Sequence, residues 1–250
     1  MNVWQWQKQR FMQQSSLMTA LAIQKGPAGQ PAPRIAFVGA GGKTTLLFAL
    51  AAELSHTGSR VIVTTSTHIW MPEGFFVTGG DLTGAARTMA AGQVAVLGSE
   101  GSDGKLTAPA AVFLSQASSL ADFVLIEADG SQGLPAKAPA AHEPVLAGDE
   151  ALVVAVAGYS ALRHPIGEVC CRPEHVAMIL KKHAGNVLSA ADLATLQADV
   201  HGGRKGVRGR FAAVLNQVNT PAELTQAARW ADSLHRRMRD GRILAVGREL

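Results

Sequence analysis

The sequence predicts a three-layer α/β protein with a mostly parallel, P-loop NTPase-like sheet, helices on both faces and an N-terminal helical arm. Short runs of consecutive apolar residues recur along the chain, which is typical of strands covered on both faces of a parallel sheet. Helical patterns lie between several of these runs, so strands and helices alternate. A glycine-rich stretch that ends in Lys-Thr-Thr follows one such run and opens a helical pattern.

Seven apolar runs are the expected strands. Several of them are separated by long connections, as parallel strands require. The runs are RIAFV (34–38), RVIVT (60–64), QVAVLG (93–98), FVLIE (123–127), ALVVAVA (151–157), FAAVLN (211–216) and RILAV (242–246).

Three helices carry clear sequence signals. Residues 44–54 place apolar side chains on one helical face. Ser189 and Asp192 have the spacing of a capping box that opens a helix to about residue 198. Pro221 suits the first position of a helix that continues through residues 222–238.

The first 33 residues are expected to form a separate unit. Residues 1–25 are rich in Gln and are interpreted as an amphipathic helix or arm with Trp4, Trp6 and Phe11 as apolar anchors. Residues 25–33, KGPAGQPAP, have the proline and glycine content of a linker. We therefore predict an arm and linker at 1–33 and a nucleotide-binding domain at 34–250.

Composition excludes several classes of protein. The 250 residues carry a formal charge of +4, a modest excess that predicts no nucleic-acid partner. The two cysteines are adjacent, which predicts no disulfide framework and a reducing, cytoplasmic location. No apolar run is long enough for a membrane span, and Gln and Ser interrupt the only stretch that resembles a signal peptide. The oligomeric state stays open.

The glycine-rich stretch VGAGGKTTL, residues 38–46, admits three interpretations, of which the simplest is a glycine turn with a solvated lysine. A dinucleotide-binding loop would need a third glycine where Thr44 stands, and an acidic residue after the second strand, where the sequence is TTSTH. A phosphate-binding loop needs small residues, a helix N-terminus, a lysine and a hydroxyl, and all four are present. The loop is shorter than the common pattern and is similar to those of Mur-type ligases. We expect phosphate binding by Gly39, Ala40, Gly41, Gly42, Lys43, Thr44 and Thr45.

Further chemistry is expected where other strands end, because open parallel sheets bind ligands at the carboxyl ends of their strands. Glu127 and Asp129 follow four apolar residues and share one side of an extended segment. With Thr44 they are the predicted ligands of Mg²⁺. The predicted catalytic residues are Lys43, Glu127, Asp129 and His68.

Two more segments are candidates for contact with a second substrate. The second strand ends in Thr65 and is followed by His68, and a proline-rich loop carries Lys137, His142 and Glu143. For each residue a plain strand end or a surface connection is the alternative interpretation.

Residues 216–219, NQVN, resemble the guanine-reading N-K-x-D motif with its lysine and aspartate replaced by amides. An amide does not accept two hydrogen bonds from guanine as a carboxylate does. A strand-to-helix turn in which Asn219 or Thr220 caps the helix that begins at Pro221 is the favoured interpretation.

Taken together, VGAGGKTTLL, RVIVTTSTHI, LIEADGSQGLPAKAPAAHEPV and CCRPEH resemble the YqeC family, described as accessory proteins for selenium-dependent molybdenum hydroxylases. The resemblance implies a nucleotide-binding maturation factor that acts with the molybdenum cofactor or a selenium species and with maturation partner proteins. It adds Arg172 and Glu174 to the candidate residues, with Arg172 beside the second substrate.

The sequence therefore predicts a protein that binds Mg²⁺ with ATP or GTP and hydrolyses the nucleotide or transfers a phosphoryl group. Two rivals stay open: a nucleotide-dependent switch or chaperone, and a Mur-like ATP-dependent ligase or small-molecule kinase. Two further hypotheses are a selenium- or sulfur-handling role for Cys170 and Cys171 beside Arg172, and an anionic-cofactor contact at Arg204 and Lys205. Packing of the two cysteines as small apolar residues is the favoured alternative.

Overall fold

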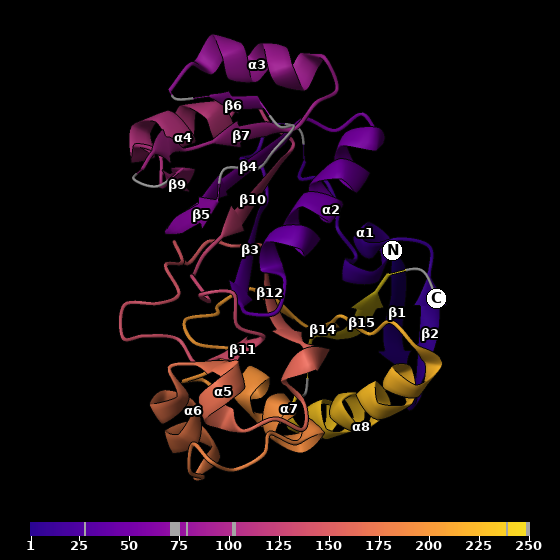
Figure 1. The fold of residues 1–250 in the computed structure, drawn as a ribbon. Helices are drawn as coiled ribbons and strands as arrows, with labels where there is room; N and C mark the ends of the chain where they lie inside the picture. Colours follow the sequence, from indigo (N-terminus) through magenta and orange to yellow (C-terminus); the bar gives the residue numbers. More distant parts are fainter. Residues whose placement is uncertain (28, 71–75, 79, 102–103, 239, 249–250) are drawn as a thin grey trace.

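The computed structural model describes residues 1–27, 29–70, 76–78, 80–101, 104–238 and 240–248. Within these residues the main sheet has ten strands in the order β2-β1-β15-β14-β12-β3-β10-β4-β7-β6. All neighbours from β15 to β6 are parallel, and β1 and β2 are antiparallel to theirs. The expected α/β architecture with a large, mostly parallel sheet is confirmed (Figure 1).

All seven expected strands are present, and each begins and ends within two residues of its expected bounds. Their apolar side chains are buried on both faces of the sheet. They are β3 (Arg34–Gly39), β4 (Val61–Thr65), β7 (Ala95–Leu97), β10 (Phe123–Glu127), β12 (Leu152–Gly158), β14 (Arg210–Asn216) and β15 (Arg242–Gly247).

The expected helices also form where their sequence signals lie. α2 (Lys43–His56) follows the glycine loop, and α7 (Ala190–Ala198) and α8 (Pro221–Arg237) each begin with a capping box, on Ser189 and on Thr220. Further helical segments of the described chain include α3 (Leu82–Ala90), α4 (Ala111–Ser118), α5 (Ile166–Val169), α6 (Pro173–Leu180) and a short 3-10 turn at Tyr159–Ala161.

Helices cover both faces of the sheet and make three layers. On β3, Ile35 and Phe37 face the cluster that contains the apolar side chains of α2. The alternate residues Ala36 and Val38 face the cluster that contains α7 and α8. α3 and α4 pack on that same second face towards the β6 end, and α5 to α8 lie towards the other end (Figure 1).

The direction of the crossovers explains why α2 lies opposite the larger helices. The connection from β3 through α2 leads towards the β6 end, whereas those from β10 to β12 and from β12 to β14 lead the other way. Right-handed crossovers in opposite directions must use opposite faces. The chain thus leaves the neighbouring strands β3 and β12 towards different faces, which opens a crevice at their carboxyl ends.

Several short strands, which the sequence patterns did not predict, form small sheets or extend the edge of the main sheet. β5 (His68–Trp70), β8 (Ser99–Glu100) and β9 (Lys105–Thr107) form a three-stranded sheet, and β11 (Ala136–Lys137) pairs with β13 (Cys170–Cys171). β6 (Phe76–Thr78) is an edge strand of the main sheet.

The prediction of an N-terminal helical arm is wrong for residues 2–14. They form a hairpin of β1 (Asn2–Gln7) and β2 (Arg10–Gln14), and only α1 (Leu17–Leu21) is helical. Lys8 and Gln9 have φ values of 49° and 61°, as a two-residue hairpin turn of type I′ requires.

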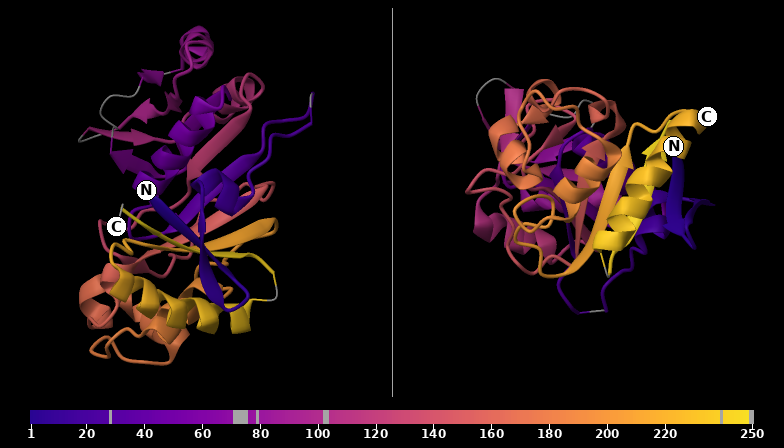
Figure 2. Two further views of the ribbon diagram at one scale, coloured as in Figure 1. Left: turned by 90° about the vertical axis from the view of Figure 1, so that its right-hand side faces the viewer. Right: turned by 90° about the horizontal axis from the view of Figure 1, so that it is seen from below.

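Burial of alternate side chains explains the hairpin. Val3 lies in the α2-side core and Trp4 in the α8-side core, so successive residues face opposite sides of the sheet. β1 pairs with β15, with Asn2 opposite Gly247, so the two ends of the described part of the chain lie side by side (Figure 2). Tertiary pairing with β15 therefore decides the conformation of this segment.

Among the described residues, no helix combines the length and the apolar character that crossing a lipid bilayer demands.

The burial of Trp4 predicts that this side chain contributes to the stability of the fold. Trp4→Ala should lower the free energy of unfolding by about 3–5 kcal/mol, because it removes a buried aromatic side chain from the junction of β1 with the core. Urea unfolding followed by circular dichroism measures this. Gln13→Ala, on the exposed strand β2, is the control and should change it by less than about 0.5 kcal/mol. Equal effects of the two changes would contradict the described packing.

Candidate functional site

The glycine loop lies at the carboxyl end of β3, between β12 and β10. Gly39, Gly41 and Gly42 all have φ in the left-handed region, at 96°, 75° and 102°. A Cβ on Gly39 would lie 2.2 Å from Val156 O, and one on Gly41 would lie 2.1 Å from Gly158 N. Gly39 and Gly41 are needed because the loop backbone packs directly on β12.

The main-chain amides of the loop fall into two groups. Those of Gly39, Ala40 and Gly41 donate to Asp129, Val156 O and Leu134 O. No acceptor within the described residues is recorded for the amides of residues 42–45, and no side chain caps α2. The open amides therefore belong to the first turn of a 14-residue helix, where anions bind favourably.

Lys43, the first residue of α2, is almost completely buried, with 2% of its surface exposed. Its Nζ donates to Gly39 O at 2.7 Å and lies 3.2 Å from Asp129 Oδ1 and 3.8 Å from Glu127 Oε1. A buried ammonium is tolerated because these oxygens surround it. In this structure the lysine is thus paired with carboxylates of the site.

Thr44 and Glu127 form a second contact at the same edge. Thr44 Oγ1 donates to Glu127 Oε2 at 2.7 Å. Burial raises the pKa of Glu127, against the opposing influence of Lys43 and Thr44. Ionised Glu127 therefore lies in an environment that a further cation would stabilise.

Asp129 links this group to a second lysine. Lys137 Nζ lies 3.0 Å from Asp129 Oδ2 and 2.7 Å from Glu143 Oε2, and it donates to Gly130 O. Glu143 in turn pairs with Arg172 Nη1 at 3.0 Å. We call the resulting series of alternating charges the ion-pair chain: Arg172, Glu143, Lys137, Asp129, Lys43 and Glu127.

The ion-pair chain has three cations and three carboxylates. Its members come from four segments: the first residue of α2, the end of β10, the loop from 128 to 151 and the residue before α6. Arg172, whose side chain is 25% exposed, is its most accessible member, and the five others are buried. Such a chain is stable only while every member keeps a partner.

Burial and pairing act in opposite directions on Glu143. Burial alone would raise its pKa, but the hydrogen bond and charge of Lys137, together with the Ala140 amide and Arg172, leave the pKa below its ordinary value. Glu143 is therefore held in its ionised form. Lys205 Nζ donates to Ala140 O and Ala141 O, and these contacts fix the loop that carries Glu143.

The other predicted site residues are placed less centrally. Thr65 is buried, and its hydroxyl donates to Glu127 O at 3.0 Å, so it fixes the end of β10. His68 and His142 are exposed. No hydrogen bond or ion pair between either histidine and the ion-pair chain is recorded for the described residues.

The structure gives no support to a selenium- or sulfur-handling role for Cys170 and Cys171. It gives none either to a cofactor contact at Arg204 and Lys205. Cys170 and Cys171 are buried in β13, and burial raises the pKa of Cys170 to about 12, with a smaller contribution from Cys171. A protonated, buried thiol is a poor nucleophile. Arg204 lies over the Phe211 ring, and Lys205 binds the carbonyls described above. Both basic side chains therefore have structural contacts.

The segment after β14 has the turn geometry that its sequence favoured. Thr220 caps α8, and Asn219 Oδ1 accepts from the Arg248 amide at 2.9 Å. Asn216 Nδ2 donates to Gly41 O at 2.8 Å. Asn216 thus fixes the glycine loop, a role that the sequence patterns did not predict.

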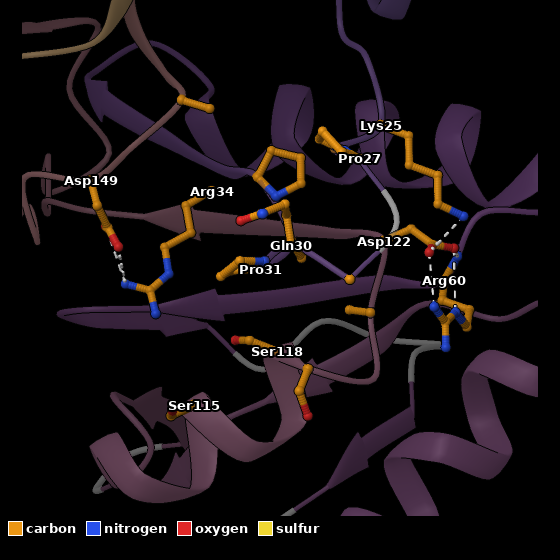
Figure 3. A pocket seen from close by; sticks show the side chains of 17 residues that line it. Lys25, Pro27, Gln30, Pro31, Arg34, Arg60, Ser115, Ser118, Asp122 and Asp149 are labelled. Carbon is orange, nitrogen blue, oxygen red and sulfur yellow. Dashed lines mark hydrogen bonds and ion pairs between the residues drawn. The ribbon is translucent and has the colours of Figure 1, made fainter.

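A cavity of about 970 Å³ lies at the opposite, amino edge of the sheet, beneath the 25–34 segment (Figure 3). Its charged groups are mutually paired: Arg34 with Asp149, and Arg60 and Lys25 with Asp122. The hydrogen bond from Arg60 holds the pKa of Asp122 well below its usual range. We place the candidate site at the carboxyl edge instead, because the open amides and the buried lysine lie there.

The residues at the carboxyl edge fit a metal–nucleotide better than a metal held by protein alone. In the described part of the chain, no cluster of three or more His, Cys, Asp or Glu side chains could hold a metal ion. Mg²⁺ commonly binds through one or two carboxylates together with phosphates and water. The Thr44–Glu127 pair beside open amides supplies that kind of partial ligand set.

Comparisons with known proteins show which family this chain resembles. The sequence model of a family described as "YqeC protein" matches residues 35–174. A protein of Escherichia coli strain K12, described as "Uncharacterized protein YqeC", is 37% identical over 146 residues, which are 56% of this chain and 57% of that protein. The aligned part thus spans little more than half the length of that relative. The family match includes the glycine loop and all six members of the ion-pair chain.

Removal of Lys137 tests the ion-pair chain. Lys137→Met should lower the free energy of unfolding by about 3–5 kcal/mol, because two buried carboxylates each lose a partner. Arg172→Met removes a partly exposed cation and should cost about 1 kcal/mol or less. Chemical denaturation of both variants measures the difference, and a loss at Arg172 as large as that at Lys137 would contradict this order.

The lowered pKa of Glu143 predicts that the stability of the protein depends on pH. A carboxyl group whose pKa is lowered by folding adds stability above its ordinary value of 4.5, and loses that contribution as the pH falls below it through the lowered pKa. Wild type should therefore exceed Glu143→Gln in stability at about pH 7, and the difference should shrink towards about pH 3. Denaturation across this range measures it, with the exposed Glu168→Gln as control. A difference that grows on acidification would overturn the assignment.

Proposed function

This chain belongs to the YqeC family, and from that premise and the geometry at the end of β3 we propose that it binds a nucleoside triphosphate with Mg²⁺. It hydrolyses the nucleotide or transfers its terminal phosphoryl group. It does so as an accessory protein in the maturation of selenium-dependent molybdenum hydroxylases. The pathway rests on the resemblance of its motifs, and the nucleotide site rests on geometry.

The open first turn of α2 beside buried Lys43 is the observation that carries the proposal. Open amides and a helix dipole favour a phosphate at residues 42–45. Thr44 and Glu127 would hold Mg²⁺, which neutralises charge on the phosphates when bound. Phosphoryl transfer needs mainly positioning and charge stabilisation, and these groups supply both.

Lys43 must change partners for this function. In the described structure it pairs with Asp129, whereas a phosphate-binding lysine donates to phosphate oxygens. Asp129 would keep Lys137 and the Gly39 amide when Lys43 turns away. The ion-pair chain therefore lowers the cost of releasing Lys43, because Asp129 is never left unpaired.

The proposal is tested by titrating ATP and GTP, with and without Mg²⁺, into wild type and Lys43→Ala. Wild type should bind at least one nucleotide with micromolar affinity that depends on Mg²⁺. Lys43→Ala should weaken binding at least about tenfold, because it removes a charge-assisted contact to phosphate. Calorimetry measures both, and Lys25→Ala, a mostly exposed lysine at the opposite edge, is the control.

Absence of binding to wild type would refute the nucleotide site. Equal weakening by Lys43→Ala and Lys25→Ala would show that binding occurs elsewhere. Nucleotide hydrolysis that rises when a maturation partner is added would support the accessory role, and product formation from a small molecule alone would favour a ligase or kinase.

A further inference from the structure

The positions of the carboxylates determine the direction in which a bound nucleotide would lie across the strands. Glu127 and Asp129 follow β10, which lies on one side of β3, and β12 lies on the other side (Figure 1). Thr44 and Glu127 would hold Mg²⁺, which would supply positive charge to the terminal phosphates. The terminal phosphates would therefore lie on the β10 side, and the nucleoside would extend over β12 towards β14.

The β12–β14 side of the loop carries an unusual glutamine. Gln217 directly follows β14 and has φ of 68°, in the left-handed region that non-glycine residues seldom adopt. Its Oε1 accepts from Ser160 Oγ at 2.6 Å. A Cβ on Gly158 would lie 2.6 Å from that Oε1. The side chain thus lies over the end of β12.

Two contacts place Gln217 beside the phosphate loop. Gly158 is the residue against which Gly41 packs, since a Cβ on Gly41 would lie 2.1 Å from Gly158 N. The preceding Asn216 binds Gly41 O. From β10 to β14 there are three strand spacings, or about 14 Å, a span that an extended nucleoside triphosphate can bridge.

We propose that Gln217, oriented by Ser160, contacts the base, and that the site accepts an adenine nucleotide in preference to a guanine nucleotide. The inference rests on the proposed function. No hydrogen-bond partner for Gln217 Nε2 is recorded among the described residues, so this side chain offers a free donor as well as an acceptor.

The chemistry of this side of the loop favours adenine. Adenine presents an amino donor next to a ring-nitrogen acceptor, which a side-chain amide complements. Guanine presents two neighbouring donors on its Watson–Crick edge, which a carboxylate complements. The segments 158–164 and 216–220 contain no acidic residue. Asn219, at the position of the aspartate in the guanine-reading motif, accepts from the Arg248 amide instead.

The test compares ATP, GTP and inorganic tripolyphosphate, each with Mg²⁺, as ligands of the full chain. The variants are Gln217→Gly and the matched control Gln132→Gly. Gln132 is also a glutamine with φ in the left-handed region, at 54°, but it follows β10. Glycine accepts this backbone conformation, so neither change should strain the fold.

Wild type should bind ATP at least about tenfold more tightly than GTP, and Gln217→Gly should weaken ATP binding by a similar factor. Binding of tripolyphosphate should not change in Gln217→Gly, and Gln132→Gly should bind all three ligands as wild type does. Gln217→Glu should move the ATP to GTP preference towards GTP, because a carboxylate accepts from guanine.

The inference fails alone if wild type binds tripolyphosphate and ATP, but Gln217→Gly binds ATP with unchanged affinity or wild type prefers GTP. If neither tripolyphosphate nor any nucleotide binds wild type, the proposed function fails and this inference fails with it. Loss of tripolyphosphate binding in Gln217→Gly would also overturn the base contact, since it would show a role in shaping the loop.

Discussion

The carboxylate of Asp129 accepts from the Gly39 amide and pairs with Lys43 and Lys137, two lysines that are almost completely buried. Each of these contacts fixes a different segment. The first orients the start of the glycine loop, the second positions the lysine of the first turn of α2, and the third holds Lys137 beside the residues that follow β10. Because buried charges are stable only in pairs, the positions of these segments depend on one another. The site is therefore one electrostatic unit rather than a set of independent side chains.

The sheet brings the members of this unit together. β10 and β12 flank β3, although they follow it by more than 80 residues in the sequence. The chain leaves β3 and β12 towards opposite faces, which leaves the carboxyl ends of these strands open. Glycines with left-handed backbone then allow the loop to lie directly on β12. Topology and loop composition thus create the same crevice.

Much of this architecture is predictable from the sequence, and the limits have physical causes. The seven apolar runs, the glycine loop, the capping box at Ser189 and the proline at 221 are local signals, and each lies where the structure places the corresponding element. The hairpin of β1 and β2 was missed because its stability comes from β15, more than 200 residues away. The sequence indicated Glu127 and Asp129 at a strand end, but it assigned Lys137 and Glu143 to a second substrate. Their pairing with Asp129 and Arg172 depends on how loops pack, which no local pattern records.

The pairing of β1 with β15 also bears on the order in which the protein is made. Residues 2–14 are synthesised well before their partner strand, residues 242–247. Until then Trp4 cannot occupy its place in the core, and the growing sheet lacks the strand that joins it to the hairpin. Contacts between such distant parts of a chain form slowly and leave sheet edges exposed meanwhile. Pairing of β1 with β15 is thus a step that must wait until residues 242–247 have been synthesised.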